Sequence, residues 1–210
     1  MKRAVPETIL AFMLAVPAFA CDSTSALGFL QRHWEETETE TIWRDRYTNC
    51  DYGYYALLPS GVIGHGTHSP APNHGFVVPL PDVGKTSLVS DDDPRLLFVN
   101  AEYNMSESRS LRRVADYQLG LASQGKATFR IVERKATTLD GLAAIRVRFE
   151  YDTSSSRMTE LEVIALRSGI VYEVGLRTRQ ADYEHDHKWL VRIQEGFRLM
   201  SLPQGPCSND

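Results

Sequence analysis

The chain has 210 residues, of which 42% are hydrophobic and 24% charged, and its formal net charge at pH 7 is −4. This composition is typical of a folded protein and argues against a disordered chain. The acidic balance argues against nucleic acid and anionic lipid as partners, because both are bound by basic surfaces.

The N-terminus has the layout of a secretory signal peptide. A positive end at residues 2–3 precedes an apolar stretch at 9–16, and the small-x-small motif 18–20 ends at Ala20, directly before Cys21. The apolar stretch is well short of the ~20 residues that a membrane-spanning helix needs, and no second stretch of that length follows. The sequence therefore predicts a signal peptide at 1–20 and an exported protein, periplasmic or secreted, without a membrane span.

Three cysteines, Cys21, Cys50 and Cys207, would then enter an oxidising compartment, where disulfides persist. One arrangement acylates Cys21 as the first residue of a lipoprotein and pairs Cys50 with Cys207. The other uses ordinary cleavage after Ala20 and leaves one thiol free. The bulky Phe19 fits ordinary cleavage better than a lipoprotein signal, so we expect a soluble product with a Cys50–Cys207 disulfide, and a lipid anchor at Cys21 remains the alternative.

Composition along the chain predicts one folded domain. Residues 21–48 are polar and include an acidic run, which indicates a solvated N-terminal lead-in. From residue 49 apolar and aromatic residues alternate with polar ones, so we expect a single α+β domain over 49–203 and a tail over 204–210.

The first part of this domain is rich in aromatic residues and then in histidine. Residues 52–58 form an expected strand that ends in a turn at 59–61. Residues 59–75 contain Gly and Pro repeatedly, which argues against a helix or a central strand there. A short strand is expected at 76–80.

The remaining chain predicts a sheet with two helices. A buried strand at 95–103 leads into an amphipathic helix at 106–125, in which apolar residues recur at helical spacing. Four strands with period-two alternation follow, and the last two are joined by Ser168-Gly169, a hairpin signal. Their expected ranges, followed by those of the closing helix and strand, are 127–134, 142–151, 158–167, 170–178, 183–196 and 197–202. The fold class is therefore α+β, a mostly antiparallel sheet covered by helices.

Charged residues alternate with the apolar ones on these strands. Arg146, Arg148, Arg167 and Arg177 lie on neighbouring strands and form either a basic strip or cross-strand pairs with glutamates on an exposed sheet face; we expect the pairs. The acidic residues within 182–186 lie at the start of the last helix, where they interact favourably with its dipole.

The second half resembles the PsbP/Mog1-type α/β/α sandwich proteins over about residues 95–200. The resemblance rests on the run 139–142 (Leu-Asp-Gly-Leu), the strand 144–151, the hairpin 162–176 and the helix 183–197. Members of that fold include accessory subunits, small periplasmic lipoproteins and binding proteins, mostly without catalysis. The resemblance therefore implies the sandwich architecture and a non-catalytic role, and it carries over no functional residue.

Three histidines in the Gly-rich loop are the candidate metal ligands. His65, His68 and His74 lie within ten residues, and neutral imidazole is a common ligand of zinc and copper. The loop lacks the fixed spacing of known catalytic zinc motifs, so loop histidines bonded to backbone carbonyls are the competing interpretation. His74 beside a strand also suits a general base of a hydrolase, although no G-x-S-x-G motif accompanies it.

The tyrosines before this loop are the candidate contact surface. Tyr52, Tyr54 and Tyr55, together with Asn73, can line a ligand groove or a partner surface, because an aromatic ring packs against flat apolar groups and keeps a polar tip. Packing of these rings in the core is the competing interpretation.

These observations favour an exported, non-catalytic binding or accessory protein of unknown ligand, without a cofactor. A periplasmic inhibitor or immunity-type protein is one concrete form, and its partner would be a protein or small ligand in the envelope. The alternative is a metal-dependent enzyme or hydrolase centred on the histidine loop, with a divalent metal as its cofactor.

Overall fold

The computed structural model describes residues 42–66, 74–80 and 95–201. Within these residues lie eleven strands, two α-helices and one short 3₁₀ turn. In chain order they are β1 (Ile42–Arg44), β2 (Arg46–Asn49), β3 (Tyr54–Leu57), β4 (Ile63–Gly66), β5 (Gly75–Pro79), β6 (Leu96–Tyr103), α2 (Leu111–Ala122), β7 (Ala127–Leu139), β8 (Leu142–Asp152), β9 (Arg157–Arg167), β10 (Ile170–Arg179), η1 (Gln180–Asp182), α3 (Tyr183–Gly196) and β11 (Phe197–Leu199).

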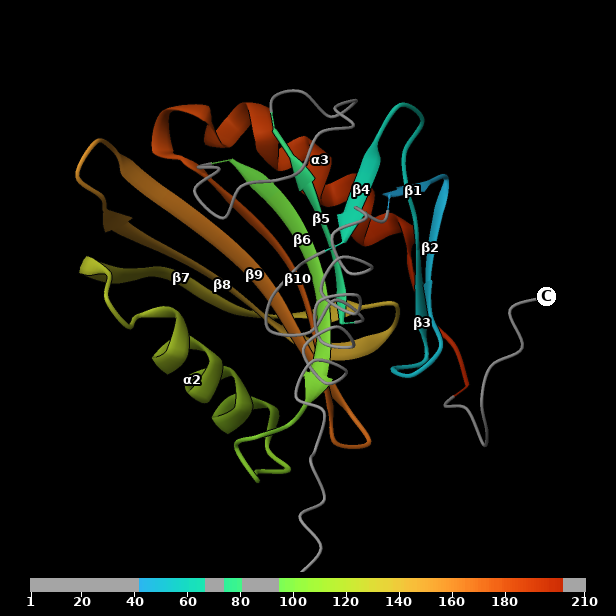
Figure 1. Cartoon of the computed structure of the whole chain (residues 1–210). Coiled ribbons are helices and arrows are strands. Elements are labelled where there is room, and N and C mark those ends of the chain that lie inside the picture. The colour runs from blue at the N-terminus through green and yellow to red at the C-terminus, as the bar shows by residue number, and fades with distance from the viewer. Residues whose placement is uncertain (1–41, 67–73, 81–94, 202–210) are drawn as a thin grey trace, which may run out of the picture. The chain divides into compact units, whose positions relative to one another are not determined.

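Eight strands form one antiparallel sheet in the order β1-β4-β5-β6-β10-β9-β8-β7 (Figure 1). The long hairpins β7–β8 and β9–β10 turn at residue pairs whose second member is a glycine with positive φ, Gly141 and Gly169. Both turns have the two-residue form that matches the twist of antiparallel strands. These two turns therefore fix the register of β7 with β8 at the hairpin end and that of β9 with β10.

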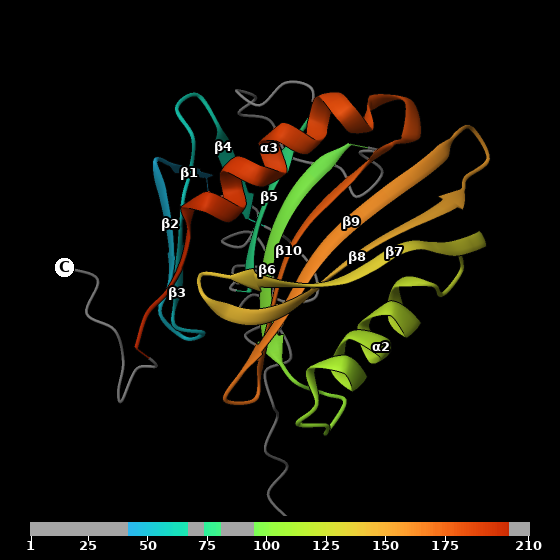
Figure 2. The ribbon, with the colours of Figure 1, turned by 180° about the vertical axis from the view of Figure 1, so that it is seen from behind.

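Helices cover the two faces of this sheet, which gives an α/β/α sandwich (Figures 1 and 2). Val114 and Ala115 of α2 pack against Ile164 of β9. Leu190 of α3 belongs to the cluster on the other face, which contains Val163. Neighbouring residues of one strand point to opposite faces of the sheet. Val163 therefore lies on the face that α3 covers, and Ile164 lies on the face that α2 covers.

A second sheet of three strands, β11-β3-β2, extends the core on the α3 side. The fully buried ring of Tyr54 on β3 stacks on Phe197 at 5.3 Å between ring centroids and meets Tyr172 of the large sheet edge-on at 6.0 Å. Tyr172 donates its hydroxyl hydrogen bond to the carbonyl of Tyr52 at 2.7 Å. These aromatic contacts join the small sheet to the large one.

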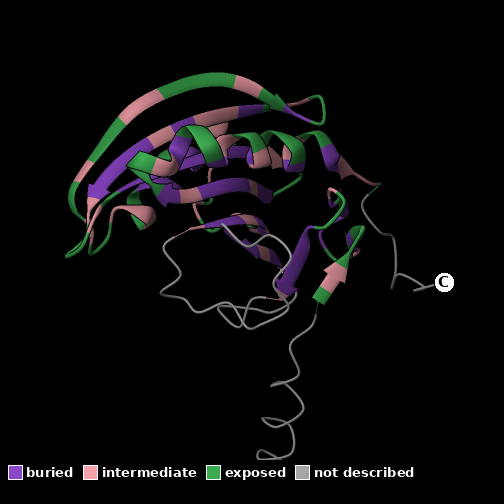
Figure 3. Ribbon diagram, turned by 90° about the horizontal axis from the view of Figure 1, so that it is seen from above, coloured by how far each residue is buried: buried purple, intermediate pink, exposed green. Residues whose placement is uncertain are grey.

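The outer strand β7 is the most exposed of the long strands (Figure 3). Its pairing with β8 is interrupted by register shifts between residues 127 and 130 and between 131 and 133. The first shift contains Thr128 at φ 56°, a backbone conformation that costs energy for a β-branched residue. The start of β7 is therefore a bulged, strained segment.

The fold class is confirmed, and four elements, β1, β2, β4 and α2, differ from expectation. β1 and all but the last residue of β2 lie within the expected lead-in 21–48, so strands already occur from Ile42, ahead of residue 49. Strands of three and four residues are too short to show a period. β4 lies within the Gly-rich loop, paired with β1 and β5. Helix α2 begins at Leu111 because Ser106 bonds the side chain of Asn104 in a preceding turn.

Candidate functional site

The aromatic segment and the histidine loop meet at one corner of the sandwich. The Tyr52 hydroxyl lies 2.8 Å from His74 Nε2, and the Tyr54 hydroxyl donates to the His74 carbonyl at 2.8 Å. The amide of Ala101 on β6 donates to that same carbonyl at 2.9 Å. His74 Nδ1 is buried and has no hydrogen-bond partner among the described residues. We call Tyr52 and His74 the Tyr–His corner.

The expected tyrosine surface is largely core. Tyr52, in the turn before β3, is 5% exposed and Tyr54 on β3 is fully buried, because both rings pack in the core cluster on the α3 side. Tyr55 points away from this core and is half-buried, with the Arg46 guanidinium 4.2 Å from its ring centroid. Tyr54 is therefore not a contact residue. Asn73 lies outside the described residues, and its role stays a prediction.

The sequence does not predict Tyr103, an exposed side chain beside the corner, or the exposed Met105 that follows it. Tyr103, the last residue of β6, is 63% exposed, and its ring centroid lies 5.4 Å from that of Tyr52. Met105 follows it in the chain and is 71% exposed. Burial of the Tyr52 hydroxyl, next to Tyr103 and Asp51, raises its pKa, so it stays a neutral hydrogen-bonding group. The corner thus presents an apolar surface next to a fixed polar pair.

The predicted three-histidine metal site stays a prediction. Among the described residues no three His, Cys, Asp or Glu side chains are grouped to hold a metal ion. His65 is buried on β4, and His74 uses Nε2 for Tyr52. His68 lies outside the described residues, so a site formed by His65, His68 and His74 is not tested.

The export and disulfide predictions also depend on residues outside those described. Ala20, Cys21 and Cys207 all lie there, whereas Cys50 lies in the turn after β2. Within the described part of the chain, no helix has the length and apolar character needed to cross a membrane.

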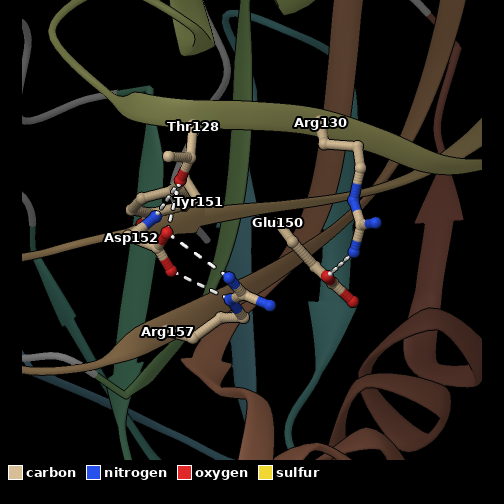
Figure 4. Close-up of a pocket in the computed structure, with 6 residues that line it drawn as sticks. All are labelled: Thr128, Arg130, Glu150, Tyr151, Asp152 and Arg157. Carbon is tan, nitrogen blue, oxygen red and sulfur yellow. Dashed lines mark hydrogen bonds and ion pairs between the residues drawn. The ribbon is translucent and has the colours of Figure 1, made fainter.

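A pocket of about 240 Å³ opens where β7 begins, β8 ends and β9 begins (Figure 4). Its lining is mostly charged and consists of Thr128, Arg130, Glu150, Tyr151, Asp152 and Arg157. The bulge in β7 turns the Thr128 hydroxyl toward Asp152, which accepts its hydrogen bond at 2.7 Å and donates a backbone one back at 3.0 Å. Sequence alternation alone cannot place a bulge, so this pocket was not expected.

The charges that line the pocket neutralise one another. Arg130 binds Glu150 at 2.6 Å, and Arg157 binds Asp152 at 2.9 Å, as Figure 4 shows. Arg157 and Thr128 together lower the pKa of the Asp152 carboxyl. A ligand would have to displace these pairs, so the pocket suits a polar ligand and has no free charge of its own to attract one.

Glutamates also line the α2 face of the sheet. Glu162 on β9 and Glu173 on β10 are diagonal neighbours there, and Glu102 on β6 accepts a hydrogen bond from Gln118 of α2. Burial and the neighbouring carboxylates raise the pKa of Glu162 well above its usual range, and they raise that of Glu173 to about 7. Glu160 on the same face is neutralised by Lys126 at 2.8 Å and by Arg177.

The four arginines singled out in the sequence do not form one strip. Arg146 and Arg148 lie on the α3 face of β8, where α3 partly covers them, and Arg177 lies on the α2 face. Arg167 donates to the Met200 carbonyl at 2.7 Å. The expected pairing with glutamates holds for Arg177 and Glu160, and the face that carries Arg146 and Arg148 is not the open surface that was expected.

Comparison with known proteins identifies the fold. No protein-family model matches the chain, and no curated protein matches it. Among solved structures it is similar to cyanobacterial PsbP (CyanoP) from Synechocystis sp. PCC 6803, with 17% identity over 76% of this chain and 92% of that one, and a TM-score of 0.52. It is also similar to LpqN of Mycobacterium tuberculosis, with 15% identity over 80% and 96% and a TM-score of 0.52. The chain therefore has a PsbP-like fold.

Proposed function

We propose that this protein is an exported, non-catalytic binding protein that contacts a protein partner in the envelope through the surface at the Tyr–His corner. The signal-peptide pattern of residues 1–20 supports export. LpqN, which shares the fold, is described as involved in cell envelope biogenesis, and this agrees with a role in that compartment.

The observation that carries the proposal is the exposure of Tyr103 beside a part-buried, hydrogen-bonded pair, with the exposed Met105 two residues later in the chain. Aromatic residues and methionine are enriched in the contact surfaces of proteins, where they supply large apolar areas. The hydrogen bond between Tyr52 and His74 fixes the Tyr52 ring, and the exposed Tyr103 ring packs against it. Tyr103 is therefore presented on a rigid support.

Site-specific photocrosslinking in the native host tests this proposal. A photoreactive phenylalanine analogue at position 103 is expected to give one discrete adduct in the envelope fraction. The matched control carries the analogue at Tyr117, an exposed residue of α2, and is expected to give none. The Tyr52→Phe variant removes the hydroxyl that binds His74 and is expected to reduce the adduct at 103.

Two results would contradict the proposal. One is recovery of the protein from the cytosol with Met1 still present, which would rule out export. The other is equal crosslinking from positions 103 and 117, which would show that Tyr103 has no special role in contact.

A further inference from the structure

Unpartnered polar atoms gather under α3, away from the Tyr–His corner. Among the described residues, five buried side-chain nitrogen or oxygen atoms lack a hydrogen-bond partner. Four of them belong to β7, β8 and β9, and two of these, Glu133 Oε1 and Arg146 Nε, form an ion pair with each other at 3.5 Å. The other two, Arg148 Nε and Thr159 Oγ1, have neither a hydrogen bond nor an ion pair with a described residue. A buried donor without an acceptor is costly, and more so when it is charged, so Arg148 Nε indicates a missing acceptor.

Arg146 and Arg148 share one face of β8. They are two positions apart, which puts their Cα atoms about 6.5 Å from each other in a strand. The same row of β8 continues through Glu150 to Asp152 in the pocket of Figure 4. On this row, Glu150 and Asp152 are carboxylates that each pair with an arginine, whereas positions 146 and 148 are both arginines.

Arg148 is the less compensated of the two arginines. It makes no hydrogen bond or ion pair with a described residue, and its guanidinium carbon lies 5.3 Å from the ring centroid of Tyr183. Among the residues that the structure describes, Arg146 pairs only with Glu133, at 3.5 Å, and Lys135 pairs with the same carboxylate at 3.0 Å. The Glu133 carboxylate thus pairs with Lys135 and Arg146, and Arg148 has no ion pair with a described residue.

His187, in the first turns of α3, lies close enough to this positive charge for its pKa to be affected. The His187 ring lies 5.4 Å from that of Tyr183, one turn earlier on the helix. Burial and then the charge of Arg146 lower the pKa of His187, with a further contribution from Arg148, and Glu184 and Glu133 oppose this shift. The neutral imidazole thereby adds a hydrogen-bonding group beside the two arginines and does not add a charge.

We propose that Arg146 and Arg148 bind a phosphate group, either free phosphate or the end of a larger molecule, between β8 and the first turns of α3. The planar guanidinium matches two oxygens of a phosphate at once, and such charge-assisted hydrogen bonds are the strong ones. Arg146 is 24% exposed at its side chain, so a small anion reaches the pair from solvent. This site is separate from the Tyr–His corner and does not depend on the function proposed for it.

Titration of the full chain with inorganic phosphate, followed by the ring signals of His187 in NMR spectra, tests the site. Sodium chloride at matched ionic strength is the reference. Wild type is expected to show saturable shifts with phosphate, and Arg148→Gln to weaken binding about ten- to a hundredfold, as loss of a charge-assisted hydrogen bond predicts. Arg148→Lys keeps the charge, loses the two-pronged donor and is expected to fall between them.

Arg113→Gln on the exposed surface of α2 is the matched control, because it removes the same charge elsewhere, and it is expected to bind as wild type does. Glycerol phosphate as a second probe distinguishes the two sources, since its binding shows that the site takes a phosphate at the end of a larger molecule. Shifts with chloride equal to those with phosphate would overturn the proposal, and so would equal binding by Arg148→Gln and Arg113→Gln. Circular dichroism checks that each variant is folded.

Discussion

Strand register alone gives Glu173 an unusual environment. Its neighbours across β10 are Asn100 on β6 and Ile164 on β9, and Glu102 and Glu162 lie diagonally on the same face. A carboxylate there is poorly hydrated and faces like charges, both of which favour the neutral acid. This explains why its pKa is raised to about 7.

Replacing Glu173 by Gln should change how stability depends on pH. The folded carboxyl keeps its proton up to about pH 7, whereas the unfolded one loses it near 4.5. The native state therefore binds more protons between these values, and the free energy of unfolding of wild type falls as the pH rises through this window. We expect Glu173→Gln to be more stable than wild type at pH 8 by on the order of 2 kcal/mol and nearly equal at pH 4.

Denaturant unfolding at several pH values measures this difference. Glu195→Gln, on the exposed side of α3, is the control and should show no such pH-dependent gain. A constant difference between Glu173→Gln and wild type from pH 4 to 8 would contradict the prediction.

Asp186 shows what sequence reading misses at this scale. The sequence places Asp186 at the start of a helix, which predicts a favourable interaction with the helix dipole. In the structure it is fully buried, binds Arg95 through both oxygens at 2.7 and 2.9 Å, and accepts the Thr178 hydroxyl at 2.6 Å. Arg95 is 91 positions away in the chain, so no local pattern links the two residues.

The elements themselves could be read from the sequence where they are long. Alternation over ten or more residues located β8, β9 and β10 to within about one residue, and helical spacing located α3. The short strands β1, β2 and β4 were missed, because three or four residues give no period and Gly64 and Gly66 argue against a strand. Burial of the Arg146 face was also missed, since it depends on where α3 crosses the sheet.

Replacement of two glycines by alanine should have opposite effects on stability. A Cβ on Gly75 of β5 would lie 1.8 Å from the Val99 carbonyl oxygen of β6, whereas a Cβ on Gly120 of α2 would meet nothing within 4 Å. Gly75→Ala should therefore push β5 from β6 and cost roughly 2–4 kcal/mol of stability. Gly120→Ala should stabilise the helix by about 1 kcal/mol.

Thermal unfolding of the two variants beside wild type measures both effects. Gly75 also follows His74 directly, so Gly75→Ala should disturb the hydrogen bond that Tyr54 donates there. A Gly75→Ala variant as stable as wild type would show that β5 and β6 do not approach as closely as described.

For the whole molecule, a disulfide between Cys50 and Cys207 would tie the tail to the start of the small sheet. Cys50 is disulfide-bonded, and its pairing with Cys207 stays a prediction. We expect Cys207→Ser to lose about 2–4 kcal/mol of stability, because the bridge would close a long loop of the unfolded chain. Cys21→Ser should keep that stability.

Intact-mass measurement of the protein from its own host, with alkylation of free thiols, checks the pairing. The expected mass lacks residues 1–20 and shows one disulfide, with Cys21 either alkylated or acylated. A bridge that survives in Cys207→Ser and disappears in Cys21→Ser would reverse the assignment.

The bulged outer strand has a consequence for how copies of this protein meet in a crowded compartment. β7 ends the large sheet and would offer its free backbone groups to any neighbouring strand. Its two register shifts distort that row, and Glu133, Arg134 and Lys135 place charges along it. An incoming strand would meet an uneven, charged template, so the longest edge of the fold is guarded against aggregation by the same irregularity that shapes the pocket beside it.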